Sequence, residues 1–276
     1  EEAAVRVSRW MNDSDEKVGS AKSEKLNAWG RAYESLRTAL AFLTQVPVGS
    51  DVCFDDDSIR HSILFYPVIG LLLGAVSYFA ASLMPFTLIL NSALIVCFLV
   101  MLTGGLHLDG LADCTDAWFG GMGDKVRTLE IMKDSHSGAM AAVSVSMFLL
   151  VKTAAVYEVL EAEQFALLIL APVLSRLSVL GLFMSTPYIG LGPIGKAIST
   201  SNPIHLYVTL ITTVVLCFFV IPKGGLILLL ALVFGLALLL RKLMLARLQG
   251  FTGDCAGAQI ELLEAFVLIG GSLVVS

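Results

Sequence analysis

Long runs of apolar residues are the feature that most constrains this chain. A helix needs about 20 mostly apolar residues to cross the hydrocarbon core of a bilayer. Six stretches meet or nearly meet this requirement: Ile63–Pro85, Leu88–Leu106, Ala139–Val159, Phe165–Met184, Leu206–Ile221 and Gly224–Leu240. A seventh run, Ala265–Val275, is short and would need Leu262 and Leu263 to span. The sequence therefore predicts an all-α, polytopic integral membrane bundle of about six to seven transmembrane helices.

The composition points to the same class. Charged residues make up 15% of the 276 residues and apolar residues 57%, whereas soluble domains carry about 25% charged residues. The formal net charge is −5, and no basic tract is dense enough to predict a nucleic-acid partner. The five cysteines show no paired or CxxC spacing, so we expect neither a disulfide framework nor a zinc site. The partner that this composition implies is a lipid bilayer.

The first part of the chain differs from the rest. Residues 1–28 mix charges with Ser, Asn and Gly, which predicts a polar, mobile extension. We expect residues 29–276 to form a single membrane-embedded domain. That domain opens with Trp29–Val46, where five apolar residues recur at helical spacing with charged residues between them. The pattern predicts an N-terminal amphipathic helix that lies in the membrane interface or is partly embedded in it.

Lys and Arg are distributed unevenly between the two ends of these spans. If every span crosses the membrane, nearly all Lys and Arg residues fall on the side of the N-terminal region and of the loops after the second, fourth and sixth spans. The other side holds only Lys223. Because cytoplasmic loops carry the excess of Lys and Arg, we expect the richer side to be cytoplasmic.

Two cationic residues fall inside predicted spans. Lys152 is a candidate for snorkelling, although it lies near the middle of its span. Arg176 lies deep in the fourth span, where an unpaired guanidinium costs several kcal/mol. We therefore expect Arg176 to face the interior of the bundle and a partner, either a phosphate or an Asp.

The densest polar sequence, Thr103–Gly138, follows the second span. Asp109, Asp113 and Asp116 are spaced i, i+4 and i+7, so a helix would project all three from one face. Like charges at this spacing repel, which makes the stripe unfavourable without a counter-charge. Mg²⁺ prefers carboxylate oxygens and substrate phosphates. The three residues are therefore candidate magnesium ligands, and the last two are also candidate catalytic residues; the alternative is a solvated acidic surface.

Glycines flank the acidic stripe on both sides, at Gly104, Gly105 and Gly110 and again at Gly120, Gly121 and Gly123. The first group would let a bulky ligand or another helix approach closely, and the second would end the helix. We expect Ser135 or Ser137 to cap the next span.

The same segment supplies candidate substrate contacts. A second short helix over Asp124–Lys133 would place Arg127 and Lys133 near the stripe, where both could contact phosphate. Arg176 joins them if its partner is a phosphate. His107 is a further candidate substrate contact, and a weaker metal ligand because nitrogen suits zinc better than magnesium.

A second polar segment, Gly250–Glu264, precedes the last apolar run. Asp254 lies among small residues there, on the same expected side of the membrane as the acidic stripe. One interpretation is a turn in which Asp254 caps a helix. The other is a second carboxylate at the site, for metal binding or proton transfer.

Several of these segments resemble the motifs of the cobalamin synthase family, the adenosylcobinamide-GDP ribazoletransferases. The segments are Thr103–Asp116 (TGGLHLDGLADCTD), Leu129–Gly138 (LEIMKDSHSG) and Phe251–Glu264 (FTGDCAGAQIELLE), with shorter pieces at Phe42–Pro47, Phe65–Gly74 and Gly190–Gly192. The resemblance runs from about residue 36 to the end. It departs at Leu108, where the family commonly has an acidic residue.

The resemblance implies a reaction and a location. The 3′-hydroxyl of α-ribazole, or of its 5′-phosphate, would attack the phosphorus nearer the corrinoid in adenosylcobinamide-GDP, and GMP would leave. Mg²⁺ is the implied cofactor, and the stripe of Asp109, Asp113 and Asp116 would supply its ligands. The implied location is the cytoplasmic (inner) membrane of a cobalamin-making bacterium, with the active site on the cytoplasmic side.

A transporter or channel with a cytoplasmic acidic cation site is the alternative class. Transporters usually place ion sites near mid-membrane, on broken helices in paired halves. Here the acids cluster at one membrane face and no paired halves are evident, which favours an enzyme. The sequence is compatible with a homo-oligomer and leaves the oligomeric state open.

Overall fold

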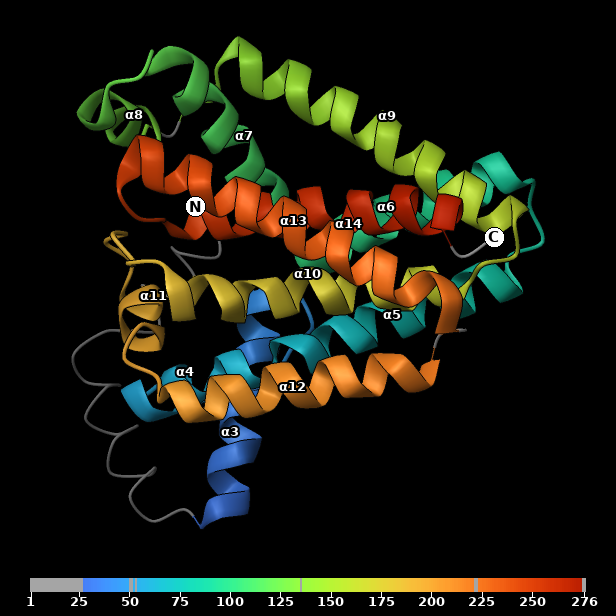
Figure 1. Ribbon diagram of the computed structural model, residues 1–276, viewed down its shortest axis with the longest axis horizontal. Helices are drawn as coiled ribbons and strands as arrows, with labels where there is room; N and C mark the ends of the chain where they lie inside the picture. Colours follow the sequence, from blue (N-terminus) through green and yellow to red (C-terminus); the bar gives the residue numbers. More distant parts are fainter. Residues whose placement is uncertain (1–26, 50–51, 53, 135, 221–222, 275–276) are drawn as a thin grey trace.

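The computed structural model describes residues 27–49, 52, 54–134, 136–220 and 223–274, and these residues are folded almost entirely into helices (Figure 1). The helices are α3 (Ala28–Leu43), α4 (Asp56–Ser62), η1 (Ile63–Phe65), α5 (Tyr66–Leu83), α6 (Leu88–Thr103), α7 (Leu106–Gly120), α8 (Lys125–Ile131), α9 (Ala139–Glu161), α10 (Ala166–Ser185), α11 (Pro193–Ile198), α12 (Pro203–Val220), α13 (Lys223–Leu248) and α14 (Gly253–Val274). Extended pairing within the described residues is limited to an isolated bridge between Tyr188 and Phe251. The predicted all-α class is confirmed.

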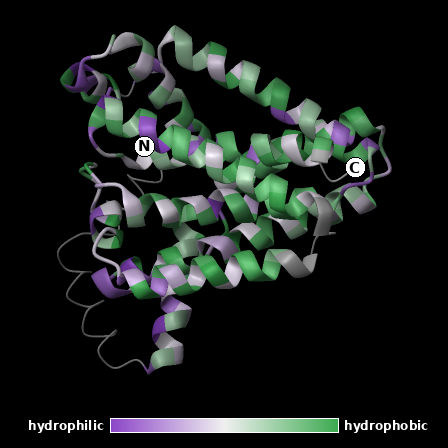
Figure 2. Cartoon of the chain, in the orientation of Figure 1, coloured by the Kyte–Doolittle hydropathy of each residue, from purple (hydrophilic) through white to green (hydrophobic). Residues whose placement is uncertain are grey.

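Five helical runs in the described part of the chain are long and apolar enough to cross a membrane: Asp56–Leu83, α9, α10, Gly225–Leu248 and Gly253–Leu273. The bent pair of α6 and α7 makes a sixth if it is one span, and α12 is a shorter apolar helix. Figure 2 shows hydrophobic residues along the long helices and many hydrophilic residues at the end that holds α4, α8 and α11. The predicted polytopic membrane bundle is thereby confirmed.

Helix α10 lies at the centre of the bundle, and 72% of its apolar stretch is buried. Small residues let α5 pack directly against its backbone. A Cβ atom at Gly70 would lie 2.4 Å from the carbonyl oxygen of Pro172, and one at Gly74 would lie 2.5 Å from the Cα of Ile169. Such close approach gives membrane helices dispersion contacts that lipid cannot replace.

A sharp bend of 90° separates α6 from α7. Gly104 and Gly105 both have left-handed backbones, with φ of 64° and 69°, a conformation that glycine adopts without steric cost. The apolar run that predicted a span over Leu88–Leu106 therefore ends as a helix at Thr103. The bend lays α7, with its aspartates, across α9 and α14.

The last span is longer than the apolar run predicted. Helix α14 begins at Gly253 rather than near Ala265, so most of the expected loop over Gly250–Glu264 is helical. The prediction was wrong because Glu261 and Glu264 interrupt the hydropathy pattern, yet both are buried among cationic partners in the bundle.

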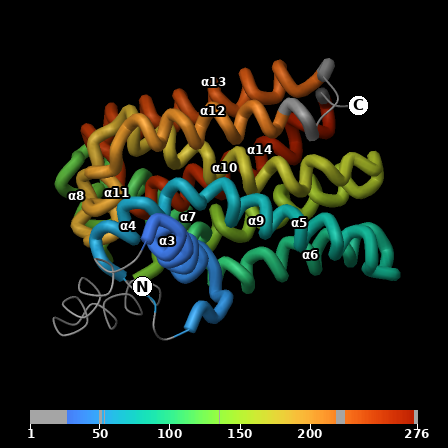
Figure 3. Tube along the Cα trace, turned by 90° about the horizontal axis from the view of Figure 1, so that it is seen from below, coloured from blue at the N-terminus to red at the C-terminus, as the bar shows by residue number. Residues whose placement is uncertain are grey.

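The predicted amphipathic helix is present as α3, which Asn27 caps by accepting a hydrogen bond from the Gly30 backbone at 2.9 Å. It runs across the long helices rather than along them, and Figure 3 views it nearly end-on. Its polar pair Glu34–Arg37 is buried, whereas Trp29 is 85% exposed. The helix therefore turns charge toward the protein and an aromatic residue outward. Its place in the membrane interface stays a prediction, and the predicted tail lies, up to residue 26, outside the described residues.

Candidate active site

The two polar segments of the sequence come together where α7 packs against α14. A Cβ atom at Gly110 would lie 2.7 Å from the carbonyl oxygen of Asp254, and one at Gly257 would lie 3.3 Å from the Cα of His107. Both glycines therefore permit near contact of the two backbones. The expected role of Gly110 in the approach of another helix is confirmed.

A pocket of about 620 Å³ opens beside this contact. Its walls come from the linker after α3, the bend before α7, the face of α7, the loop between α8 and α9, the first turns of α9, and the start of α14. The lining residues are Gln45, Gly104, Gly105, Leu106, Leu108, Asp109, Ala112, Asp113, Met132, Lys133, Asp134, Ser137, Val145 and Asp254. A pocket of this size is in the range that small-molecule and nucleotide ligands occupy.

Three predicted carboxylates face this pocket. Asp109 is exposed, and Asp113 and Asp254 are half-buried. The Thr252 hydroxyl lies 3.2 Å from the Asp254 carboxylate, to which it donates, and 3.4 Å from the Cys255 backbone N–H, from which it accepts. Thr252 thus caps α14, and Asp254 stands inside the first turn with its side chain at the pocket. The interpretation of Asp254 as the helix cap is wrong.

Asp116, the third member of the stripe, does not line the pocket among the described residues. Its carboxylate accepts hydrogen bonds from the backbone N–H groups of Gly138 and, at 2.9 Å, of Ala141. These are orphan donors at the first turn of α9, whose N-cap residue is Gly138. The expected cap at Ser137 is wrong because an aspartate from α7 satisfies these donors, and Ser135 lies outside the described residues.

The predicted second helix is confirmed as α8, capped by Asp124, whose carboxylate accepts from the Arg127 backbone at 2.7 Å. Lys133, just after α8, lines the pocket, so one of the predicted phosphate contacts lies beside the carboxylates. Arg127 is exposed on α8 and is not among the described lining residues. Its contact with substrate stays a prediction.

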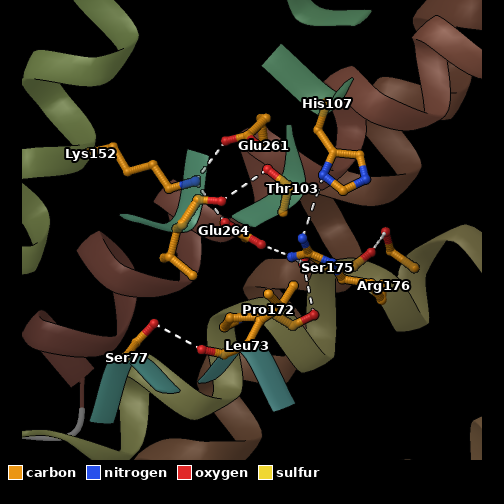
Figure 4. Close-up of polar contacts among 12 residues, drawn as sticks. Leu73, Ser77, Thr103, His107, Lys152, Pro172, Ser175, Arg176, Glu261 and Glu264 are labelled. Atoms are coloured by element: carbon orange, nitrogen blue, oxygen red, sulfur yellow. Dashed lines mark hydrogen bonds and ion pairs between the residues drawn. The ribbon is translucent and has the colours of Figure 1, made fainter. Parts of the chain in front are cut away.

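His107 and Arg176 lie beneath the pocket rather than in its wall. Both are buried, and a nitrogen of Arg176 lies 3.5 Å from Nδ1 of His107 (Figure 4). Arg176 faces the interior as expected, and it pairs with Glu264 rather than with an Asp. The contacts of Arg176 and His107 with substrate stay predictions. Lys152 does not snorkel: it is buried and donates to Glu261 and Glu264.

The sequence reasoning missed Gln45, Met132 and Asp134 as lining residues. The Gln45 backbone donates to Leu102 at 2.7 Å, and its side chain lies across Gly104 at the bend. Each of the three lies in a segment that carried the family resemblance, which was the available signal. Asp134 hydrogen-bonds His136 at 2.7 Å, which raises the pKa of that imidazole and lowers the pKa of the carboxyl.

The end of α13 holds α7 and α8 in place. The guanidinium of Arg247 donates to the carbonyl of Trp118 at 3.2 Å and to the hydroxyl of Thr128 at 3.3 Å, and lies over the Trp118 ring. Lys125 donates to Gln249 at 3.0 Å. The wall that carries Asp109 and Asp113 is thus fixed from outside by cationic side chains that do not enter the pocket.

The donor set of the pocket fits a magnesium ion that the substrate helps to hold. Within the described residues, no group of three His, Cys, Asp or Glu side chains is arranged to hold a metal by itself. Mg²⁺, however, usually takes one or two carboxylates together with waters and substrate phosphates. Asp109, Asp113 and Asp254 offer hard oxygen donors around one open space, which Lys133 also lines.

A carboxylate-lined pocket in a bundle of apolar helices is a site of the kind that membrane-embedded enzymes use. The sequence profile described as cobalamin-5-phosphate synthase matches residues 35–272. The chain therefore belongs to the cobalamin-5-phosphate synthase family and is a transferase of cobalamin biosynthesis. Family membership sets aside the transporter or channel alternative.

Curated relatives agree with this assignment. The chain is 44% identical over 243 residues to a protein of Stutzerimonas stutzeri named adenosylcobinamide-GDP ribazoletransferase, which covers 87% of this chain and 98% of the relative. It is 43% identical over 238 residues to the protein of that name from Pseudomonas fluorescens, covering 85% and 98%. The Pseudomonas entomophila protein is 44% identical over 239 residues, covering 86% and 98%. No solved structure matches the chain.

Proposed function

We propose that the pocket between α7 and α14 joins α-ribazole, or its 5′-phosphate, to the corrinoid of adenosylcobinamide-GDP. The 3′-hydroxyl oxygen of the ribazole forms a bond to the phosphorus nearer the corrinoid. The bond from that phosphorus to the bridging oxygen breaks, and GMP leaves with the oxygen. The products are adenosylcobalamin, or its phosphate, and GMP. The observation that carries this proposal is the convergence of Asp109, Asp113 and Asp254 with Lys133 on one pocket.

Four of the lining residues have a task at the diphosphate in this reaction. Asp109 and Asp113 would hold Mg²⁺, which neutralises charge on the diphosphate and its leaving oxygen. Lys133 would donate hydrogen bonds to the phosphates. The side-chain amide of Gln45, which lies across Gly104 at the bend, would supply a neutral hydrogen-bond donor. These contacts hold the diphosphate in line with the incoming hydroxyl, and such orientation removes part of the barrier.

The hydroxyl of the ribazole must lose a proton as its oxygen attacks. Asp254 enters the pocket from α14, whereas Asp109 and Asp113 enter from α7, so it can approach the nucleophile while the other two hold the diphosphate. A carboxylate in hydrogen-bond reach of the hydroxyl can accept this proton. We assign Asp254 this role, with metal binding as the alternative.

The location follows the distribution of charge. The connection from α7 to α9 carries Lys125, Arg127 and Lys133, the connection from α10 to α12 carries Lys196, and the C-terminal part of α13 carries Arg241, Lys242 and Arg247. Because positive loops face the cytoplasm, the pocket opens to the cytoplasmic side of a bacterial inner membrane. Both nucleotide substrates are polar and would reach the pocket from water.

Release of GMP tests the proposal directly. The purified protein in detergent should release GMP from adenosylcobinamide-GDP only when α-ribazole and Mg²⁺ are both present, and a chelator should stop it. GMP release at an unchanged rate in the presence of the chelator would show that the reaction does not need the metal. Absence of any GMP with all components present would overturn the assigned reaction.

A further inference from the structure

Four charged side chains lie together inside the bundle (Figure 4). They are Lys152 of α9, Arg176 of α10 and both Glu261 and Glu264 of α14, and each is between 1% and 4% exposed. Lys152 donates to Glu261 at 2.6 Å and to Glu264 at 2.7 Å, and Arg176 pairs with Glu264. We call these four residues the charge cluster. It holds two cations and two anions, so it is neutral as a whole.

A neutral buried cluster is a costly way to stabilise a helix bundle. Taking ions out of water carries a large desolvation penalty, and well-packed apolar residues of similar volume are often equally stable. In membranes, ionisable residues that face the bundle interior usually mark function. None of the four lines the pocket among the described residues, so a direct contact with the diphosphate does not explain the cluster.

The spacing along α14 connects the charge cluster to the pocket. Asp254 and Glu261 are seven residues apart, which is two helical turns, so they project from nearly the same stripe of the helix. Ionic contacts on Glu261 and Glu264 from two different helices therefore fix the rotation of α14 about its axis. The same rotation decides whether Asp254 points at Asp113 or away from it.

A second link runs to α7. Arg176 lies 3.5 Å from His107, two residues before Asp109, and Gly257 of α14 lets α14 pack against the His107 backbone. Nε2 of His107 has no hydrogen-bond partner in the described structure, so the ring makes its polar contact through the nitrogen that faces Arg176. The cluster thus touches both helices that carry pocket carboxylates.

We propose that Lys152 is a positioning residue, which sets the rotation of α14 through Glu261 and Glu264 so that Asp254 meets the carboxylates of α7. This inference rests on the proposed function for its metal and substrate, and on geometry alone for the rotation. If Lys152 had a purely structural role, the protein would require only that no buried charge is left unpaired.

Three variants separate the two roles. Lys152→Met leaves an unpaired carboxylate. Lys152→Met combined with Glu261→Gln restores neutrality but removes the ionic contact between α9 and α14. Lys152→Arg, which we call the exchanged variant, replaces one cation by another and so keeps both neutrality and the ionic contact between α9 and α14. Asn91→Leu is the matched control, because it removes a buried polar side chain that bonds to the Met84 carbonyl, on another part of the bundle.

The native thiols of Cys114 and Cys255 report the rotation without any substrate. Their sulfur atoms lie 3.9 Å apart across the contact of α7 and α14. Diamide, a diazene oxidant, can take two electrons and two protons from the pair to form a disulfide, and is reduced to its hydrazine. We expect rapid cross-linking in the unmodified chain and in the exchanged variant, and cross-linking about tenfold slower in the neutral double variant. Cys114→Ser should abolish the product, which peptide mass spectrometry identifies.

Binding of Mn²⁺ in the presence of adenosylcobinamide-GDP but without α-ribazole, followed by its paramagnetic resonance, gives a readout apart from catalysis. The neutral double variant should unfold at the temperature of the unmodified chain yet bind Mn²⁺ about tenfold more weakly, the lower end of losses seen when residues that orient metal ligands are changed. The exchanged variant should recover affinity, and Asn91→Leu should keep it.

The proposal is overturned if the neutral double variant cross-links, binds Mn²⁺ and releases GMP like the unmodified chain. It is also overturned if the exchanged variant folds but cross-links as slowly as the neutral one. Failure of the unmodified chain to release GMP, with the cross-linking pattern intact, would instead overturn the proposed reaction and leave the positioning role standing.

Discussion

Asp113 and Asp116 lie three residues apart on α7 but have different surroundings. Asp113 faces the pocket, and Asp116 accepts two backbone hydrogen bonds at the start of α9. Sequence spacing placed both on one stripe and could not distinguish them, because the partner of Asp116 lies at the start of the next long helix. The distinction predicts different consequences for the same substitution.

Asp113→Asn is expected to abolish transfer and leave the melting temperature in detergent nearly unchanged, because it removes a ligand charge and breaks no described hydrogen bond. Asp116→Asn keeps one acceptor oxygen and loses the other, so it should destabilise the protein by about 1 kcal/mol, as loss of a helix cap does. It should retain part of the transfer rate. A fully stable Asp116→Asn protein without transfer would restore this residue to the metal site predicted from the sequence.

Thr252 and Asp254 provide a second contrast at the start of α14. Thr252→Val removes the capping hydroxyl and should lower the free energy of unfolding by about 1 kcal/mol, with modest loss of transfer. Asp254→Asn should keep the stability and lose transfer. Thermal unfolding and GMP release on the same preparations check both, and full transfer by Asp254→Asn would exclude it as the base.

The contact of α7 with α14 is the element on which the pocket depends. Gly110 allows the α7 backbone to approach the carbonyl of Asp254, and no side chain fits between them. The shape of the pocket therefore depends on this close approach of the two helices.

Gly110→Ala should separate the helices, since its Cβ would lie 2.7 Å from a backbone oxygen. We expect a loss of about 1–3 kcal/mol, typical of overpacking, together with most of the transfer activity. Gly181→Ala is the control, because a Cβ at that position of α10 meets nothing within 4 Å. Equal behaviour of the two variants would show that the close approach is not needed.

The sequence predicted the existence of α7 and α8 because helical spacing is a local signal. It predicted the meeting of the two polar segments from their expected place on one side of the membrane. It did not predict the bend at Gly104 or the full length of α14. In both cases a tertiary contact decides the outcome: α7 turns so that it can pack on α14, and Glu261 can lie within a span only because Lys152 is beside it. Hydropathy read along a single segment cannot include such partners.

At the scale of the whole molecule, orientation in the membrane decides which compartment supplies the substrates. Reporters inserted after residues 86 and 161 are expected on the outer side, and those after 123, 195 and 249 in the cytoplasm. The reason is the excess of Lys and Arg on the second set of connections. Protease protection of the reporter after residue 123 in inside-out vesicles would contradict the placement of the pocket.

The charge cluster also has a consequence for how the chain is made. Translation runs from the N-terminus, so α9 and α10 enter the bilayer before α14 exists. Until then Lys152 and Arg176 lack both glutamates, and a cation at the centre of a membrane helix costs about 2.5–3.5 kcal/mol on insertion scales. The nascent bundle therefore stays incomplete until its final helix arrives, and a chain arrested before Gly253 would present two unpaired cations to membrane quality-control proteases.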